Sequence, residues 1–487
     1  MIETSSLLLP LIILAVASVA AALFGIPALN KRLTITQLCW LLALAPLAAL
    51  ILIVRIVPAL NEGAIFVWTW PWLPSLGLSL GLYVDSLSAL FAIIVTFIGV
   101  LVVMYAGQYF KGDQDAWRFM AYLLLFMTSM LGVVMAGDVL TLFIFWEGTS
   151  FLSFLLVAYK SDSEEARYGA FRALFITGGG GIALLAGLLF VSSVAGGTDF
   201  ATILSSGDVL RSNEFYGVML ALVAFGAFTK SAQFPAHIWL PGAMSAPTPA
   251  SAYLHSATMV KAGIYLMARM NPALGFTETW FWLLTLTGGM TMIVGAYLGF
   301  KQNDWKALLA YSTISQLGIL MILIGQDIVE AYKALVIGVV AHALYKSALF
   351  MVAGIIDHET GTRDMRRLGG LHTVMPFTFF VGTLAALSMA GLPPMFGFLA
   401  KETLLATAVH PSLPPLLSEV FRWGAVLAGA LMLAMAVMVI WDTFMGQPKD
   451  EAVQGMKRRG RCGWRRLFRR CCRFIWPLPQ ASKTRRN

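Results

Sequence analysis

Residues Thr229–Gly263 read TKSAQFPAHIWLPGAMSAPTPASAYLHSATMVKAG. Apolar sequence flanks this segment on both sides, yet it carries Lys230, His237, His255 and Lys261. An ionisable side chain in the middle of a bilayer costs roughly 2.5–3.5 kcal/mol on insertion scales. Such groups are therefore expected to pair with one another or to line water, which is how ion paths through membranes are built.

Four prolines interrupt the same segment and break its helices; they are Pro235, Pro241, Pro247 and Pro249. A polar loop between two spans, with lysines reaching towards the membrane surface, is the simpler explanation. It accounts for His237, which follows the first break. It does not suit Lys230 or Lys261, because each has apolar helix on both sides. We therefore interpret the segment as part of an ion path around a broken helix.

The composition is that of a protein that crosses a membrane many times. Of 487 residues, 59% are hydrophobic and 12% are charged, whereas about a quarter of a soluble protein is charged. The net charge is +9, but twelve of the 34 Lys and Arg residues lie from Ala452 onward, where there is no acid. The rest of the chain has 22 Lys and Arg residues and 25 Asp and Glu residues. The basic character belongs to the tail, and we expect no nucleic-acid partner.

The sequence indicates neither a cofactor nor a metal site. Its four cysteines form no Cys-x-x-Cys pair and no Cys/His metal spacing, so we expect no disulfide framework and no zinc centre. Flavin, iron–sulfur and nucleotide motifs are missing as well. The chain alone is therefore not expected to carry out redox catalysis.

We predict an all-α fold of about thirteen transmembrane helices, because runs of about 20 apolar residues can cross a bilayer as helices. The seventh and twelfth spans are long and interrupted. The loop with Trp68, Trp70 and Trp72 suits an aromatic belt at the membrane interface. The predicted spans are 5–25, 34–57, 84–107, 117–136, 138–158, 168–194, 216–242, 248–268, 277–300, 305–325, 331–355, 374–409 and 420–445.

Basic residues are unevenly distributed between alternate loops. Arg211, Arg269, Lys333 and Arg422 belong to one set of loops, and eleven basic residues belong to the other. The richer set is expected in the cytoplasm, so the N-terminus would lie outside the cell membrane and the C-terminus inside. This bias alone explains the arginines of the loop DHETGTRDMRRLGGL without a binding role. The eleven are Lys31, Arg32, Lys111, Arg118, Lys160, Arg167, Lys301, Lys306, Arg363, Arg366 and Arg367.

The fifth span, DVLTLFIFWEGTSFLSFLLVAY, carries Glu147 near its middle. A lone carboxyl group there would be protonated or paired; a neutral glutamic acid hydrogen-bonded between helices is the alternative to a role in an ion path. The sixth span contains the run Gly178–Gly181, which we attribute to close helix packing. No strand precedes this run, so it does not indicate a nucleotide-binding loop.

The ninth to twelfth spans repeat the pattern. His342 and Lys346 lie four residues apart, on one face of the eleventh span. Pro393 and Pro394 break the twelfth span before Lys401. Two broken spans five apart, each with a lysine, predict two five-helix units that are inverted relative to each other. The predicted parts are the first three helices (1–110), the first repeat (111–270), the second repeat (271–446) and a basic cytoplasmic tail (447–487).

These motifs resemble those of the antiporter-like membrane subunits shared by respiratory complex I and multisubunit Mrp cation/proton antiporters. The resemblance covers roughly residues 80–445 and rests on FWEGTSFLSFLL, TKSAQFPAHIWLPGAM and APTPASAYLHSATMVKAG. It continues through LLAYSTISQLG, HALYKSALFMVAGIIDHETGTRD and GLPPMFGFLAKE. The loop HETGTRD and the form FWEGTSFLSF look most like the large A subunit of Mrp antiporters.

The resemblance implies a proton path. Glu147 and Lys230 would be its carboxylate–lysine pair, and Lys401 its terminal lysine. The sixth span lacks the acid that some complex I subunits carry there, which favours the Mrp side. We include His237 because it lies in the same broken segment. The expected path residues are Glu147, Lys230, His237, His255, Lys261, His342, Lys346 and Lys401.

The end of the chain departs from the family. The A subunit that it resembles continues with a fourteenth core span and a long C-terminal region, whereas this pattern stops after the thirteenth span, near Pro448. The basic tail from about Gln454 could bind anionic lipid headgroups. An altered reading frame or a truncated gene would also produce such a tail, and we favour the altered frame.

Three functions remain open. We favour a proton-translocating subunit that exchanges protons for Na⁺ or another monovalent cation, within a membrane hetero-oligomer of partner subunits. The second is a proton-pumping subunit of a complex I-like NADH:quinone oxidoreductase, in which case the chain would be part of an enzyme. The third is a scaffold made inactive by truncation.

Overall fold

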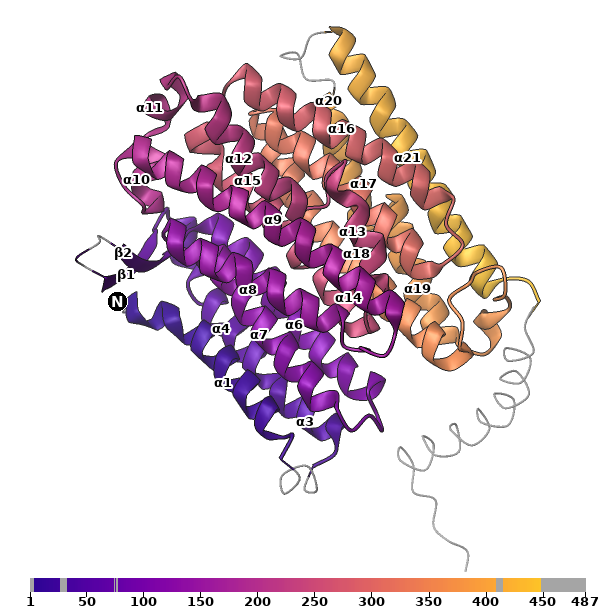
Figure 1. Ribbon diagram of the computed structural model, residues 1–487. Helices are drawn as coiled ribbons and strands as arrows, with labels where there is room; N and C mark the ends of the chain where they lie inside the picture. Colours follow the sequence, from indigo (N-terminus) through magenta and orange to yellow (C-terminus); the bar gives the residue numbers. More distant parts are fainter. Residues whose placement is uncertain (1–3, 27–32, 74, 76–77, 409–414, 448–487) are drawn as a thin grey trace, which may run out of the picture.

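The computed structural model describes residues 4–26, 33–73, 75, 78–408 and 415–447. In these ranges the chain is a bundle of helices that run side by side (Figure 1). Ten described helices are long and apolar enough to cross a membrane, and the shorter α12 (Tyr216–Lys230) and α19 (Pro376–Ala390) are apolar as well. The predicted all-α, multi-pass membrane fold is confirmed. The basic tail lies outside the described residues.

The predicted spans without a break follow the helices closely. The second span consists of α3 (Ile35–Leu42), α4 (Leu44–Val54) and α5 (Val57–Asn61) in succession. The short η1 (Thr4–Leu8) precedes the first span. The remaining unbroken spans are α1 (Leu9–Leu23), α6 (Ser86–Tyr109), α7 (Ala116–Met135), α8 (Val139–Val157), α9 (Glu164–Ala195), α16 (Glu278–Phe300), α17 (Trp305–Gly325), α18 (Val329–Thr360) and α21 (Pro415–Phe444).

Three spans are broken in the middle. The seventh is α12 followed by η3 (Ala236–Ile238), α13 (Trp239–Gly242) and η4 (Ala243–Ser245), and the twelfth is α19 followed by α20 (Phe396–Ala408). Both breaks were predicted from their prolines. The eighth span was predicted as one helix over 248–268, and this is wrong: it consists of α14 (Thr248–Leu254) and α15 (Met259–Leu274).

The unpredicted break has a physical cause that involves side chains. Thr258 has φ −127° and ψ −99°, which is not helical. Its hydroxyl donates to the Tyr253 carbonyl (2.8 Å), and Lys261 donates to the Ser256 carbonyl (2.5 Å). These side chains replace helix hydrogen bonds that the break removes, so the opened backbone is not left unpaired inside the membrane.

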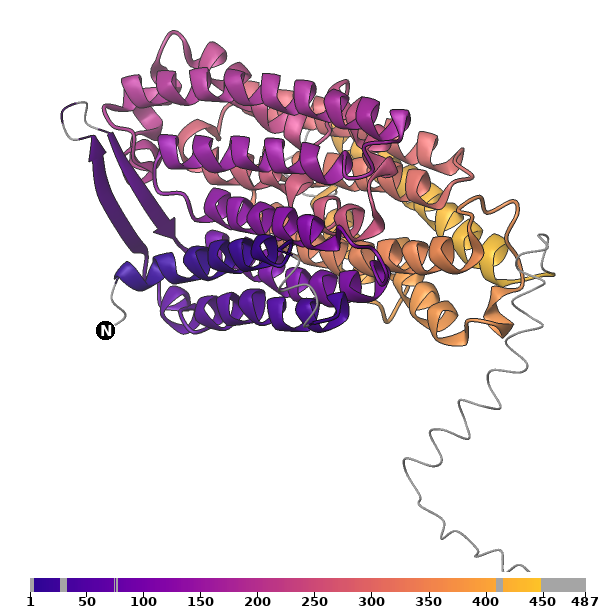
Figure 2. The same cartoon turned by 60° about the horizontal axis from the view of Figure 1, so that its bottom comes forward.

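The long loop after the second span forms a β-hairpin, which was not predicted. β1 (Phe66–Leu73) and β2 (Leu78–Val84) pair antiparallel, with Phe66 opposite Val84. Figure 2 shows the hairpin at one end of the helices. Trp70 and Trp72 are 50% and 45% exposed. We call this end of the molecule, with its short helices α10 (Phe200–Ser205) and α11 (Gly207–Ser212), the hairpin face.

The opposite end carries the α16–α17 and α18–α19 connections, the latter containing η5 (Leu371–Thr373). Lys160, Lys306 and Arg363 of the richer loop set line one recess at this end, which we call the basic face. Arg269, which was counted with the loops of the other set, is instead buried in α15 with 4% exposure.

In both predicted repeats, one helix begins with an aspartate cap, the next helix ends at a glycine, and the capping aspartate forms a backbone bridge to a second aspartate. At the hairpin face, Asp138 caps the start of α8, Gly196 ends α9 with φ +79°, and Asp138 bridges Asp199 across the two backbones. At the basic face, Asp304 caps α17, Gly361 ends α18 with φ +71°, and Asp304 bridges Asp364. A positive φ suits glycine, which has no Cβ to clash.

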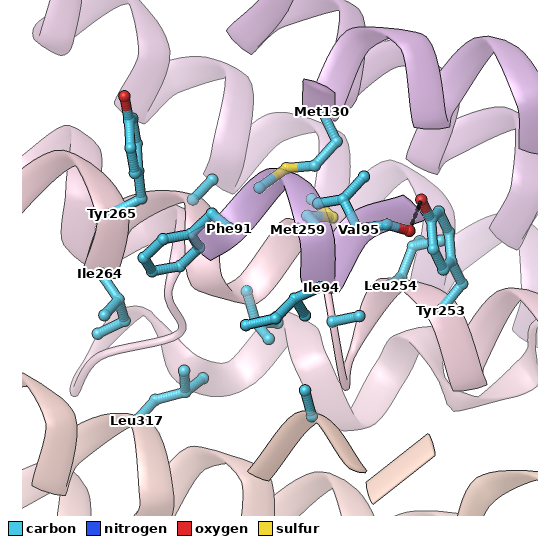
Figure 3. Packing of buried hydrophobic residues seen from close by; sticks show 14 of the residues in the cluster. Phe91, Ile94, Val95, Met130, Tyr253, Leu254, Met259, Ile264, Tyr265 and Leu317 are labelled. Atoms are coloured by element: carbon cyan, nitrogen blue, oxygen red, sulfur yellow. Dashed lines mark hydrogen bonds between the residues drawn. The ribbon is translucent and has the colours of Figure 1, made fainter. Parts of the chain in front are cut away.

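The broken eighth span lies at the centre of the molecule. Figure 3 shows Leu254 and Met259, on either side of the break, packed with Ile94 and Val95 of α6 and with Met130 of α7. The Tyr253 hydroxyl donates to the Val95 carbonyl (3.0 Å). Apolar packing on both half-helices holds the break in place and surrounds its polar residues with low-dielectric protein.

Candidate functional site

Four lysines from the predicted path lie inside the helix bundle. Lys230, Lys261 and Lys346 have no exposed surface, and Lys401 is half-buried. In the described part of the chain, no ion pair with a carboxylate includes any of them. Their ammonium groups instead donate to backbone carbonyls and hydroxyls. Such acceptors hold a lysine without fixing its charge as a carboxylate would.

Lys230 is the last residue of α12, at the first break. Its Nζ donates to the Trp146 carbonyl (3.0 Å) and to the Ser150 hydroxyl (2.6 Å), both on α8. The ammonium also lies 5.0 Å from the centre of the Trp146 ring, which provides a cation–π contact. Lys230 is thus bound to the residue before Glu147 and to the residue three positions after it on the same helix.

Glu147 lies against the glycine run of α9. A Cβ at Gly181 would overlap with its Oε1, and one at Gly180 would overlap with the Thr229 hydroxyl. The run therefore makes room for a carboxyl group and a hydroxyl, in addition to bringing helix backbones close. Glu147 Oε1 is buried without a hydrogen-bond partner among the described residues. A direct Glu147–Lys230 ion pair is likewise missing there.

Lys261 and His255 lie at the break between α14 and α15. Besides the Ser256 carbonyl, Lys261 donates to the Val339 carbonyl of α18 (3.0 Å). His255 is fully buried between the rings of Trp239 (6.2 Å) and Phe350 (6.3 Å). Neither of its ring nitrogens has a hydrogen-bond partner among the described residues.

His342 and Lys346 continue this polar line on α18. The Lys261 contact at Val339 is about one turn before His342. His342 is fully buried, and both of its ring nitrogens lack partners within the described ranges. Lys346 donates to the Leu309 carbonyl (3.1 Å) and to the Ser312 hydroxyl of α17.

Lys401 lies after the break between α19 and α20, whereas Lys230 lies before the break that follows α12. The Lys401 ammonium reaches back to donate to the Ala390 carbonyl (2.5 Å) at the end of α19. Gly391 (φ +74°) provides space for the lysine, because a Cβ there would overlap with the Lys401 side chain. A cavity of about 20 Å³ touches Lys401, Tyr345 and Gln316, which is room for one water molecule. This cavity brings Lys401 next to the helix turn that carries Lys346.

His237 lies in η3 and is nearly buried. Its ring stacks on Phe234 (centroids 5.6 Å apart), and its Nδ1 has no partner in the described part of the chain. No hydrogen bond or ring contact of the described residues joins it to another predicted path residue. The structure therefore places seven of the eight predicted residues in two buried groups and leaves His237 outside both. Glu147 and Lys230 lie between α8 and α12. The second group lies around the α14–α15 break and along α18 and consists of His255, Lys261, His342, Lys346 and Lys401.

Lys306 and Arg363 belong to this region but were treated as loop residues. Lys306 is 2% exposed and donates to the Ala246 carbonyl (2.8 Å), just before α14. Arg363 donates to the Met244 carbonyl (3.3 Å) and pairs with Asp304 (3.2 Å). A polar recess of about 440 Å³ opens beside them, lined among others by Lys160, Glu165, Asp357 and Asp364. The sequence alone does not distinguish these cations from loop residues whose only role is to orient the protein in the membrane.

Comparisons with known proteins agree with this architecture. Residues 136–428 match the family model described as NADH:quinone oxidoreductase/Mrp antiporter, TM. Residues 70–120 match the model for the N-terminus of NADH-ubiquinone oxidoreductase (complex I) chain 5.

Curated relatives include proteins of cation/proton antiporters. The chain is 43% identical over 409 residues to the probable A/B subunit of a K(+)/H(+) antiporter of Rhizobium meliloti, covering 84% of this chain and 41% of the relative. It is 41% identical over 449 residues to the A subunit of an Na(+)/H(+) antiporter of Alkalihalophilus pseudofirmus, covering 88% and 55%. The chain thus spans about half the length of these relatives.

Solved structures share the fold. A chain of the Mrp complex from Dietzia sp. is 36% identical, with a TM-score of 0.78 and 93% of this chain covered, against 48% of its own length. A chain of an archaeal membrane-bound sulfane sulfur reductase has the same TM-score at 21% identity, over 92% of this chain and 90% of its own length, which shows a common fold. With its broken helices and matching family models, the chain belongs to the antiporter-like membrane subunits of the NADH:quinone oxidoreductase/Mrp antiporter family.

Proposed function

We propose that this chain is the proton-translocating subunit of a multisubunit monovalent cation/proton antiporter. The observation that carries the proposal is the set of fully buried lysines, Lys230, Lys261 and Lys346, whose ammonium groups are held by carbonyls and hydroxyls. The first two lie at helix breaks and the third lies within α18. Burial lowers the pKa of a lysine from about 10.4, and a nearby carboxylate raises it. Movement of one charge therefore changes the protonation of the next lysine.

Protons would enter from the basic face. The polar recess beside Lys306 leads to the connection before α14, and α14 ends at His255. The unpaired nitrogens of His255 and His342 support a relay, because a buried polar atom without a partner is costly unless water or a mobile proton joins it. Lys346, the small cavity and Lys401 would complete the path in the second unit.

The two inverted units, 111–270 and 271–446, supply the alternating half-channels. The matching aspartate bridges support this division, since Asp138–Asp199 and Asp304–Asp364 close equivalent helix pairs at opposite faces. An odd number of spans per unit inverts the second copy. Residues 1–110 would form a separate group of three helices.

The exchanged cation and the partners are inferred from relatives. One relative is named as a probable K(+)/H(+) antiporter subunit and the other as an Na(+)/H(+) antiporter subunit, and we propose Na⁺. Partner subunits would cover the break between α19 and α20, where Pro393 and Pro394 are exposed. Opened backbone does not face lipid directly within a bilayer. The basic face would lie in the cytoplasm and the hairpin face outside the cell membrane.

The test is cation-dependent proton flux in vesicles that contain the full set of partner subunits. Lys346→Met removes the ammonium but keeps an unbranched chain, so we expect normal assembly and loss of flux. Flux at the wild-type level would reject the path. A scaffold would show unchanged flux, and a redox pump, which the family description also covers, would need NADH and quinone rather than a cation gradient.

A further inference from the structure

One charged group inside the bundle has no part in the proton path described above. Arg269 lies on α15 eight residues after Lys261, and Tyr265 lies midway between them. Residues four apart share a helix face, so these three side chains form one stripe. It runs from the central break to the hairpin face over about 12 Å. The stripe is the shortest route along α15 between Lys261 and the water at that face.

The stripe ends in a buried ion pair. Arg269 Nη1 lies 2.5 Å from Asp85 Oδ2, and Nη2 lies 2.8 Å from Oδ1. Nη2 also donates to the Ser88 hydroxyl (2.8 Å). The guanidinium lies 5.3 Å from the ring centres of both Tyr83 and Tyr265. Arg269 is 4% exposed and the Asp85 side chain is 25% exposed, so the positive end of the pair points inward.

Tyr265 connects this pair to the core. Its hydroxyl accepts from Arg269 Nε and Nη2 (both 3.2 Å) and donates to the Val134 carbonyl of α7 (2.9 Å). The ring packs edge-on against Phe91 (5.4 Å). In Figure 3 the Tyr265 hydroxyl points away from the apolar cluster. We call Asp85, Tyr265 and Arg269 the hairpin-face clamp; it joins α15 to α6, α7 and the end of β2.

We propose that the hairpin-face clamp seals the proton path against leak towards the hairpin face. An arginine side chain stays protonated at all working pH values and cannot pass a proton on. A positive charge that is desolvated also repels hydronium and other cations. At the basic face, by contrast, a polar recess reaches Lys306. The path is therefore open towards one side and closed towards the other, as alternating access requires.

The clamp does not open with pH in the working range. Burial raises the pKa of the Asp85 carboxyl, but the hydrogen bonds and charge of Arg269 outweigh burial and hold this pKa below its ordinary value. The Ser88 backbone N–H and hydroxyl also lower the pKa of Asp85, and the Tyr83 phenol lies close enough to interact with the Asp85 charge. A carboxyl group with a lowered pKa stays charged above that value. The pair should therefore be intact between about pH 6 and 9.

The experiment measures passive proton leak in proteoliposomes with the complete subunit complex, without an exchangeable cation and with a lipophilic ion to relieve the membrane potential. We expect Arg269→Met to raise the leak per assembled complex at least about five-fold, because the sealing charge is lost. Asp85→Asn should raise it to a similar extent, because the guanidinium loses the carboxylate that holds it in place, and Tyr265→Phe should raise it less. Arg269→Lys keeps a positive charge but introduces an ammonium that can release a proton, so it should leak more than the wild type and less than Arg269→Met. Arg211→Ala is the matched control, since Arg211 also lies at the hairpin face and donates to the α15 carbonyl of Pro272.

The inference rests on the proposed proton path, and the two can fail separately. Wild-type leak per complex in all three clamp variants would overturn the clamp while leaving coupled exchange untouched. If the first two variants do not assemble, wild-type leak in Tyr265→Phe rejects it. Normal coupled exchange in Lys261→Met would instead reject the path. If leak runs through the path, adding Lys261→Met to Asp85→Asn should abolish the extra leak; persistence of that leak would show that the clamp does not guard Lys261.

Discussion

At the level of single residues, the candidate site depends on glycines as much as on ionisable residues, because a glycine leaves space that a neighbouring side chain can occupy. Gly181 leaves the space that the Glu147 carboxyl group occupies, and the neighbouring Gly179 faces open space. The two glycines share a helix and a sequence run but differ in what they contact. Substituting each glycine in turn therefore tests whether the run matters for the space beside Glu147 or only for the helix itself.

Gly181→Ala should displace the Glu147 carboxyl group and strongly reduce coupled flux, because overpacking of this kind costs about 1–3 kcal/mol. Gly179→Ala should leave flux near the wild-type level, and its helix propensity is if anything improved. Flux in vesicles normalised to assembled complex decides this. Equal flux in the two variants would mean that the space beside Glu147 has no functional importance.

Lys230→Ala should abolish proton-coupled flux while assembly stays near normal. The ammonium is lost, and the Ser150 hydroxyl still donates to the Trp146 carbonyl of α8. Glu147→Ala should have the same effect if the two groups set each other's protonation. Full activity in Lys230→Ala would rule out its role.

Lys401 and Glu402 are adjacent but face different surroundings. Lys401 is half-buried and donates to the end of α19, whereas Glu402 is exposed. Neighbouring residues on a helix point about 100° apart. We expect Lys401→Ala to stop flux and Glu402→Gln to have a smaller effect. Lys401→Met removes the charge but keeps a long side chain, so it tests whether Lys401 only anchors the broken helix. Transport retained in Lys401→Met would contradict a role of Lys401 in the proton path. A greater loss of flux in Glu402→Gln than in Lys401→Ala would contradict it as well.

At the level of elements, the break between α14 and α15 is the feature with most consequences. It brings Lys261 to the Ser256 carbonyl and lets the same ammonium reach Val339 of α18. A continuous helix would pair its own carbonyls and would leave Lys261 without these acceptors. The half-helices are packed on all sides, so the break is held by tertiary contacts.

Thr258→Val should destabilise this break by roughly 1–3 kcal/mol, because the valine keeps the shape but loses the hydrogen bond to the buried Tyr253 carbonyl. The expected readout is a lower thermal midpoint of the purified complex together with reduced flux. Thr258→Ser keeps the hydroxyl and serves as the control. A Thr258→Val complex that unfolds and transports like the control would show that the hydroxyl does not hold the break.

At the level of the whole molecule, the two faces differ in chemistry. The basic face has a recess lined by charged and polar groups, and the hairpin face carries exposed tryptophans and the buried Asp85–Arg269 pair. Lysine and arginine collect on the cytoplasmic side of membrane proteins. The direction of the proposed proton path therefore depends on which face lies in the cytoplasm.

Reporter fusions at Gln447 and within the 58–80 loop should lie on opposite sides of the membrane, with Gln447 in the cytoplasm. Gln447 follows α21 at the basic face, and the loop contains the hairpin. An alkaline phosphatase reporter, active outside, and a fluorescent protein, active inside, provide the two measurements. The same side for both would contradict thirteen crossings, and exchanged sides would reverse the orientation.

The sequence determined the membrane class, the spans, and two of the three breaks, because apolar run length and proline act locally along the chain. The same holds for the ionisable residues inside spans, since an ionisable group within an apolar run is visible in the sequence and is costly in a bilayer unless it is paired or hydrated. The resemblance supplied Glu147 and Lys230 as a pair. It was not possible to know from sequence that Lys230 rests on the carbonyl and hydroxyl beside Glu147.

Only the tertiary structure decided the rest. The break before Lys261 contains no proline. It depends on the hydrogen bonds that the Thr258 and Lys261 side chains donate to backbone carbonyls. Arg269 and Lys306 read as ordinary loop cations, but the first is buried against Asp85 and the second against Ala246. Gly181 borders the candidate site only because the Glu147 carboxyl group of another helix packs against it. In each case the partner lies on a different element, and sequence spacing carries no information about contacts between elements that packing brings together.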